Sequence, residues 1–204
     1  MIEKICAIVL VVEGDTDKYF YDSFLDKFEY RRKLSNIEFK IINVKGIGNF
    51  KKDSLRKCEY YLLHKKKKDI PTYIFLCYDS DIFTRKFAQN PPFDYDNLKK
   101  GLSKLQDVQE VYNIIAEESI EDWFLFDLES VCKYLNIRSI QHKALKGNSG
   151  EDKLKHLFKK ADKVYNKGSN PDSGKFIDSL NLDLIIKQNE ELFEKFNNIL
   201  STYG

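Results

Sequence analysis

Carboxylate side chains follow directly after two strongly apolar segments of the sequence. Residues 5–12 form a continuous apolar run that ends before Glu13, and residues 73–78 form a second run that is followed by Asp79 and Asp81. Continuous runs of this kind are typical of strands that are covered on both faces in a parallel sheet. All strands of an open parallel sheet present their carboxyl ends at one edge, where ligand sites form. We therefore expect these three carboxylates to meet at that edge.

Carboxylates that are crowded at a strand edge repel one another, and a bound divalent cation is the usual remedy. The chain has three histidines and four cysteines, and no two cysteines have a CxxC spacing. The usual ligands of a zinc site are therefore missing, and oxygen ligands favour a hard cation. We expect a site for one or two Mg²⁺ or Mn²⁺ ions, and buried free thiols at the cysteines.

The elements that must position these residues follow from the apolar pattern. It predicts further strands at residues 39–44 and 111–116, a helix that begins at Asp15, and helices over 50–64 and 119–135. Alternation of strands and helices is typical of right-handed βαβ units. We predict an α/β fold in which a central parallel sheet is flanked by helices.

The remainder of the sequence is interpreted as loops and helices. Residues 82–106 contain Asn-Pro-Pro followed by an expected short helix, and they are interpreted as a loop-rich insertion. Residues 166–174 are a loop by composition. We predict a catalytic domain over residues 1–135 and a helical C-terminal extension over 136–204 that packs on it. One buried helix face of the extension is expected to comprise Leu154, Leu157, Phe158, Ala161 and Tyr165.

Charge is strongly segregated, although the formal net charge is only +2. Residues 51–68 contain eight basic and two acidic residues, residues 117–129 six acidic and no basic ones, and residues 143–175 nine basic and four acidic ones. An acidic centre between basic segments indicates a metal site beside a surface for a polyanion. The lysines expected to contact nucleic acid are Lys45, Lys51, Lys52, Lys65, Lys66, Lys146 and Lys175.

The longest apolar run, at residues 5–12, is far shorter than the ~20 residues that a transmembrane helix requires. The first residues contain Glu3 and Lys4 and no small-residue cleavage site, so a secretory signal is not expected. These features predict a cytoplasmic protein that has no membrane partner.

Three segments together resemble the Toprim domain of the OLD-type (overcoming lysogenization defect) nucleases. They are VVEGDTDKYFY at residues 11–21, NVKGIGNF at 43–50 and FLCYDSD at 75–81. The family pattern is Glu-x-x-x-Asp after the first strand, a Gly-rich turn after the second, Asp-x-Asp after the third and a further acidic motif after the fourth. The resemblance covers about residues 5–125 and implies the Rossmann-like Toprim fold.

The resemblance also implies roles for the acidic residues of the first three motifs. Glu13 would bind metal and act as an acid or base. Asp79 and Asp81 would be the metal-binding pair, and Asp17 would be the additional ligand that allows a second ion.

In the fourth motif, the family's Ser-x-x-Glu corresponds here to Ser119-x-x-Asp122, which departs from it by one methylene group. The ligand in this segment is therefore Glu118, Glu121 or Asp122. OLD-type sites also use a downstream lysine. Lys146, Lys167 and Lys175 are the candidates, and Lys167 is the first choice because it begins a Gly-containing loop.

The function that the resemblance implies is divalent-metal-dependent hydrolysis of phosphodiester bonds in DNA, with a role in defence against phage. Two alternatives remain open: a Toprim ribonuclease that acts on structured RNA, and a non-catalytic Toprim-fold protein that binds nucleic acid or mediates its processing. OLD proteins have an ATPase domain, whereas this sequence contains no GxxxxGK[ST] motif. The resemblance therefore also implies a separately encoded ATPase partner.

Overall fold

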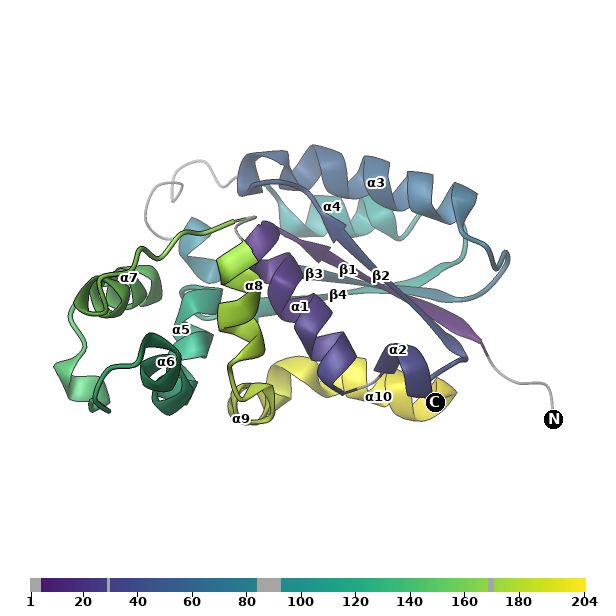
Figure 1. Ribbon diagram of the computed structural model, residues 1–204. Helices are drawn as coiled ribbons and strands as arrows, with labels where there is room; N and C mark the ends of the chain where they lie inside the picture. The colour runs from purple at the N-terminus through teal and green to yellow at the C-terminus, as the bar shows by residue number, and fades with distance from the viewer. Residues whose placement is uncertain (1–4, 29, 84–92, 169–170) are drawn as a thin grey trace.

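The structure is a computed structural model that describes residues 5–28, 30–83, 93–168 and 171–204 (Figure 1). Its strands are β1 (Cys6–Val12), β2 (Ile37–Asn43), β3 (Thr72–Asp79) and β4 (Val108–Ala116). They form one sheet in the order β2-β1-β3-β4, and every neighbouring pair is parallel. The predicted parallel sheet is confirmed.

The position of each strand in the sheet explains its sequence pattern. β1 and β3 lie in the interior of the sheet, and all seven residues of β1 are buried. Both faces of an interior strand are covered, so its residues are apolar without alternation. β2 and β4 are the edge strands, and buried and more exposed residues are mixed along them.

Helices cover both faces of the sheet. The α-helices are α1 (Asp15–Lys27), α2 (Tyr30–Lys33), α3 (Phe50–His64), α4 (Tyr95–Leu102), α5 (Ile120–Phe124), α6 (Leu128–Leu135), α7 (Gly150–Lys160), α8 (Pro171–Asp178), α9 (Leu182–Gln188) and α10 (Glu194–Tyr203). Short 3₁₀ helices are η1 (Ile47–Asn49), η2 (Ser80–Phe83), η3 (Leu125–Asp127), η4 (His142–Ala144) and η5 (Glu190–Phe193). α3 and α4 lie on one face of the sheet, and α1, α8 and α10 lie on the other (Figure 1).

Each face of the sheet carries its own hydrophobic cluster. Under α3 and α4, strand residues such as Val9 and Ile74 pack with Phe50. On the opposite face the larger cluster joins α1 to the C-terminal helices, because the ring of Phe24 lies 5.4 Å from that of Phe193, measured between ring centroids. The helices after residue 135 therefore contribute to the same core as the strands.

The predicted helix over residues 119–135 is interrupted in the structure. α5 ends at Phe124, and α6 begins only at Leu128. Asp127 causes the break, because its carboxylate accepts hydrogen bonds from the backbone N–H groups of Ser130 (3.3 Å) and Asn181 (2.6 Å). Capping of this kind favours a new helix start.

The predicted helix face from Leu154 to Tyr165 is too long. α7 ends at Lys160, since Asp162 adopts a left-handed conformation (φ 54°) and the N–H of Lys163 donates to the carbonyl of Phe158 (2.9 Å). This arrangement is a common way to end a helix. Tyr165 is consequently outside the helix, although it is buried.

The short helix expected after Asn-Pro-Pro is present as α4, and one predicted loop also contains a helix. α4 lies within the predicted insertion at residues 82–106, while the Asn-Pro-Pro sequence at 90–92 lies outside the described residues. α8 begins at Pro171, inside the predicted loop at 166–174. Proline is favoured at the first position of a helix, because it has no N–H group to leave unpaired there.

The four cysteines are buried free thiols, as the sequence predicts. Among the described residues, no helix combines the length and the apolar character that crossing a bilayer requires.

Candidate acidic active site

Glu13 follows β1 at the carboxyl edge of the sheet. Its Oε2 atom is buried, and no described residue donates a hydrogen bond to it. Burial raises the pKa of the Glu13 carboxyl, the negative charges of Asp81 and Glu121 raise it further, and Lys167 opposes them. A buried carboxylate oxygen without a partner is unfavourable, and a bound cation would stabilise it.

Asp17 and Asp79 lie beside Glu13. Asp17 is in the first turn of α1, where its carboxylate accepts a hydrogen bond from the backbone N–H of Gly14 (3.2 Å). Asp79 is the last residue of β3, and its Oδ1 accepts from the backbone N–H of Ile120 (2.9 Å). Burial raises the pKa of Asp17 to about 7, and the charges of Glu13 and Glu121 contribute.

The pKa of Asp79 also lies well above its usual range. Burial is the main cause, followed by the charges of Asp17 and Glu121. Because carboxylates from three separate segments affect one another in this way, the structure brings them together at one edge of the sheet.

The Asp-Ser-Asp segment after β3 is tied to the loop after β4. The Oγ of Ser80 accepts from the backbone N–H of Glu118 (2.8 Å), and the N–H of Asp81 donates to the carbonyl of Glu118 (3.1 Å). Glu118 has a positive φ of 61°, and its side chain is exposed. Of the three candidates in the fourth motif, Glu118 thus contributes its backbone to the site.

Glu121 is the candidate that lies within the acidic cluster. It is fully buried at the start of α5. Its Oε1 accepts a hydrogen bond from the hydroxyl of Tyr165 (3.1 Å), and its Oε2 forms an ion pair with the Nζ of Lys167 (3.1 Å).

Asp122 faces a different neighbour. Its carboxylate accepts from the hydroxyl of Ser119 (2.9 Å) and from the N–H of Gly150 (3.2 Å), and it forms an ion pair with Lys153 (3.4 Å). A Cβ atom on Gly150 would lie 2.5 Å from the backbone nitrogen of Asp122. Asp122 therefore joins α5 to α7 and has a structural role. Its neighbour in the sequence, Glu121, belongs to the acidic cluster.

Lys167 is brought to the cluster by the segment between α7 and α8. The N–H of Gly168 donates to the hydroxyl of Thr16 (3.3 Å), which holds this segment against the start of α1. The Nζ of Lys167 lies 3.1 Å from Glu121 and 3.3 Å from Glu151. Burial lowers the pKa of Lys167, but the charges of Glu121, Asp79 and Glu151 outweigh it and raise the pKa, so the side chain stays protonated.

The other two lysine candidates lie elsewhere. Lys175 is exposed and forms an ion pair with Asp172 of its own helix (3.4 Å), and Lys146 is exposed in the segment before α7. Lys167 is therefore the candidate that the structure places beside the carboxylates.

Two residues of the site were not predicted from the sequence. Tyr165 donates a hydrogen bond to Glu121, and Glu151 forms an ion pair with Lys167. Burial would raise the pKa of Glu151, but its contacts with Lys155 and Lys167 lower it overall. Tyr165 stands two residues before Lys167, which is a usable signal for the site. It was obscured because Tyr165 also fits the helical spacing of α7.

The acidic residues at this edge are potential ligands of a metal ion. In the described part of the chain, no three Asp, Glu, His or Cys side chains are already arranged so that they could hold one. The chemistry of the set nevertheless fits a hard cation, because all the donors are carboxylates, Glu13 has an unpartnered buried oxygen, and the pKa values of Glu13, Asp17 and Asp79 are raised.

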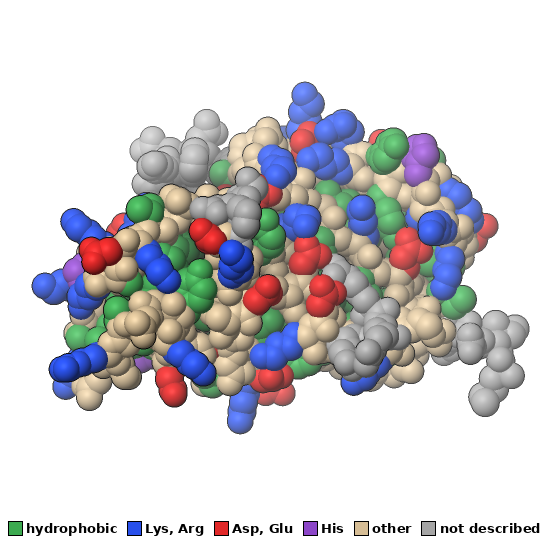
Figure 2. Space-filling view, in the orientation of Figure 1, with side chains coloured by type: hydrophobic (Ala, Val, Ile, Leu, Met, Phe, Trp, Pro, Cys, Tyr) green, Lys and Arg blue, Asp and Glu red, His purple; other side chains and the backbone are tan. Residues whose placement is uncertain are grey.

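Lys and Arg side chains gather over α3, on the face shown in Figure 2. Lys51, Lys52 and Lys66 are exposed on this helix or within two residues of its end. Lys45 is exposed at the carboxyl edge of the sheet and forms an ion pair with Asp15. Basic side chains therefore lie close to the acidic edge.

The expectation for Lys65 is corrected by the structure. Its side chain is fully buried, and its Nζ lies 3.0 Å from Asp107 and donates to the hydroxyl of Thr72 (3.1 Å). Burial of the ammonium group is tolerated because both partners are polar. Lys65 fixes the connection between α3 and β3 and is not available to a ligand.

Residues 6–76 match a family model, the TOPRIM domain of overcoming lysogenization defect protein-like sequences. No curated protein and no solved structure matches the chain. The match confirms the resemblance over the segment from β1 into β3, and it ends before Asp79. Toprim domains act on nucleic acids and bind divalent metal ions, so the match supports a domain of that kind here.

Proposed function

We propose that this chain, whose residues 6–76 match the OLD-like Toprim domain, is a divalent-metal-dependent nuclease that hydrolyses phosphodiester bonds in DNA. The observation that carries the proposal is the buried group of carboxylates at the sheet edge, with the unpartnered Oε2 of Glu13 among them. So many buried like charges are unfavourable without a cation, which makes a structural role alone a poor explanation for them.

Glu13, Asp79 and Asp81 would hold Mg²⁺ or Mn²⁺, and Asp17 and Glu121 would serve a second ion. When bound, the metal would activate water and stabilise the leaving oxygen. Glu13 and Asp17 follow β1, Asp79 ends β3 and Asp81 comes two residues later, and Glu121 follows β4.

Glu13 is suited to move a proton during the reaction. Its pKa is raised by burial and by neighbouring acids. A carboxylate whose pKa is raised accepts a proton from an attacking water more readily than an ordinary one, and it can release the proton afterwards.

Lys167 is suited to stabilise negative charge on a phosphate. Glu121 and Glu151 fix its position, its pKa is raised, and 43% of its side chain is exposed. A positioned ammonium group can therefore face a substrate at the surface while it remains anchored to the acidic cluster.

The test is a cleavage assay with supercoiled, linear and single-stranded DNA and with RNA, in Mg²⁺ and in Mn²⁺. Glu13→Gln and Asp79→Asn should each lower the cleavage rate by about 100-fold or more, because each removes a charged group needed in the transition state. Glu129→Gln, which changes an exposed acid on α6, is the matched control and should cleave as the wild type does.

The substrates separate the proposal from its alternatives. Cleavage of structured RNA in preference to DNA would establish the ribonuclease. Full cleavage by both site variants would remove the assigned site. Metal-independent binding without cleavage of any substrate would leave a nucleic-acid-binding protein.

The family resemblance supports a further proposal about biological context. The protein would act in the cytoplasm, in defence against phage, together with a separately encoded ATPase.

A further inference from the structure

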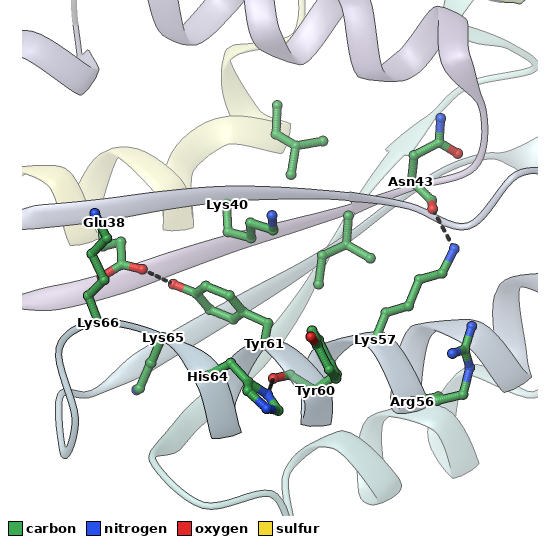
Figure 3. Close-up of a pocket in the computed structure, with 12 residues that line it drawn as sticks. Glu38, Lys40, Asn43, Arg56, Lys57, Tyr60, Tyr61, His64, Lys65 and Lys66 are labelled. Carbon is green, nitrogen blue, oxygen red and sulfur yellow. Dashed lines mark hydrogen bonds between the residues drawn. The ribbon is translucent and has the colours of Figure 1, made fainter.

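A groove of about 660 Å³ lies between the edge strand β2 and α3 (Figure 3). One wall is formed by side chains of β2, among them Lys40 and Asn43, and the other by side chains of α3, among them Arg56 and Tyr60. Since β2 has a neighbour on one side only, the groove follows a strand edge that no other strand of the described chain covers.

The groove is basic. Lys40, Arg56, Lys57 and Lys66 line it, whereas its acidic lining residue is Glu38, which accepts a hydrogen bond from the hydroxyl of Tyr61 (2.7 Å). Asp53 offsets part of the charge, because it lies 3.3 Å from Arg56 and 3.4 Å from Lys57. Lys40 and Lys66 are exposed, and neither forms an ion pair with a described residue.

The groove also presents an aromatic surface. The Tyr60 ring stacks on the His64 ring, with 4.2 Å between their centroids and 25° between their planes. Tyr60 is nevertheless 65% exposed, so the ring is accessible from outside the protein. An exposed ring that is supported from behind by another ring is a suitable platform for a nucleobase.

The groove runs toward the acidic site. Asn43 is paired in register with Val12, the residue that precedes Glu13. Adjacent strands lie about 4.8 Å apart, so one end of the groove is next to the carboxyl edge that carries Glu13. The Nζ of Lys57 donates to the carbonyl of Asn43 (2.8 Å), which fixes a cation at this end.

We propose that the groove between β2 and α3 binds single-stranded nucleic acid and leads it to the carboxylate site. The proposal rests on the proposed function, and it specifies the form of the substrate and the path of its backbone. Cations placed along the whole groove suit a chain of phosphates, and the exposed ring of Tyr60 suits an unpaired base. A base in a duplex is stacked on its neighbours and could not use Tyr60.

Binding is measured by fluorescence anisotropy with the full chain in EDTA, so that cleavage does not interfere. The probes are labelled oligonucleotides of about 12 nucleotides, as single-stranded DNA, single-stranded RNA and duplex DNA. Lys40→Ala combined with Arg56→Ala should weaken single-strand binding about tenfold at low salt. It should also reduce the slope of log K against log[salt] by about 1.4, since each lost phosphate contact accounts for about 0.7.

Two matched controls accompany this variant. Lys133→Ala combined with Lys160→Ala removes the same charge from exposed positions on α6 and α7 and should leave the affinity unchanged. Tyr60→Ala should weaken binding at least about fivefold, whereas Tyr60→Phe should keep it, because stacking needs the ring and not the hydroxyl. Unchanged melting temperatures establish that each variant is folded.

Three results would each contradict the proposed groove. They are wild-type affinity in the Lys40/Arg56 variant, an equal loss of affinity in the Lys133/Lys160 control, and tighter binding of duplex than of single strands. If the wild type cleaves nucleic acid and the groove variant binds normally, only the groove is wrong. If the groove variant loses binding but the wild type cleaves no substrate, the groove stands and the proposed nuclease is wrong.

Discussion

Asp17 lies among side chains of its own charge at the start of α1. Its pKa is raised from 3.8 to about 7, first by burial and then by Glu13 and Glu121. Between about pH 4 and pH 7 the folded protein therefore holds a proton that the unfolded chain has released. The stabilisation from this proton is complete below the pKa of the unfolded chain, 3.8, and is lost as the pH rises through the pKa of the folded protein, about 7.

Asp17→Asn should therefore raise the melting temperature of the metal-free protein at pH 8 and change it little at pH 4. A gain of several degrees is expected, because about 1 kcal/mol shifts the melting temperature of a chain of this size by about 2–4 °C. Differential scanning calorimetry in EDTA across this pH range measures the effect. Glu129→Gln should leave the pH profile unchanged, and an equal effect of Asp17→Asn at both pH values would contradict the assignment.

The acidic residues could be predicted from the sequence only in part. Glu13, Asp79 and Asp81 follow apolar strands, so the sheet topology was enough to place them. Glu121 and Asp122 are neighbours in sequence, and their different surroundings depend on where Tyr165 and Gly150 lie in the fold. The burial of Lys65 depends in the same way on Asp107, which is distant in sequence.

At the scale of the elements, the close packing of α5 against α7 positions Lys167. Gly150 has no room for a side chain, because a Cβ atom would lie 2.5 Å from the Asp122 nitrogen and 2.7 Å from its carboxylate. The next residue is Glu151, which contacts Lys167. A displacement of α7 would therefore be transmitted to the lysine.

Gly150→Ala is expected to destabilise the protein by about 1–3 kcal/mol, as overpacked sites do, and to lower the cleavage rate through Lys167. Urea denaturation and the cleavage assay measure the two effects. Gly101→Ala in α4 is the control, since its Cβ would lie 3.7 Å from Leu55, an ordinary contact, and alanine is favoured over glycine in a helix. Equal stability of the two variants would show that α5 and α7 can separate without cost.

The secondary structure could be predicted where the spacing of apolar residues was the dominant signal. α3 was predicted with the bounds that the structure has, because its apolar spacing continues without a competing cap. The helix breaks at Asp127 and Asp162 were not predicted. The first depends on a side-chain cap and the second on a left-handed residue, and the spacing of apolar residues reveals neither.

At the scale of the whole molecule, one hydrophobic cluster joins β1, α1 and β3 to α10. Phe196 on α10 packs against Phe24 of α1 (5.6 Å between centroids) and against Phe75 of β3 (5.6 Å). The C-terminal extension is therefore expected to unfold together with the sheet.

Phe196→Ala should destabilise the protein by about 3–5 kcal/mol, as loss of a buried aromatic ring usually does. The sequence has a single tryptophan, Trp123, which is buried beside Phe193. Tryptophan fluorescence and circular dichroism during urea denaturation should follow one transition in the wild type and in the variant. Val164→Ala, at a residue that is 76% exposed, should have almost no effect. Two separate transitions would contradict a shared core.

Lys167 comes from a part of the polypeptide that lies about 90 residues beyond the end of the family match. A fragment that ends after α6 would contain the acidic residues but not Lys167, whose ammonium group offsets their charge. Such a fragment would lack both the charge of Lys167 and the C-terminal helices of the shared core, so adding divalent ions alone is not expected to restore its fold.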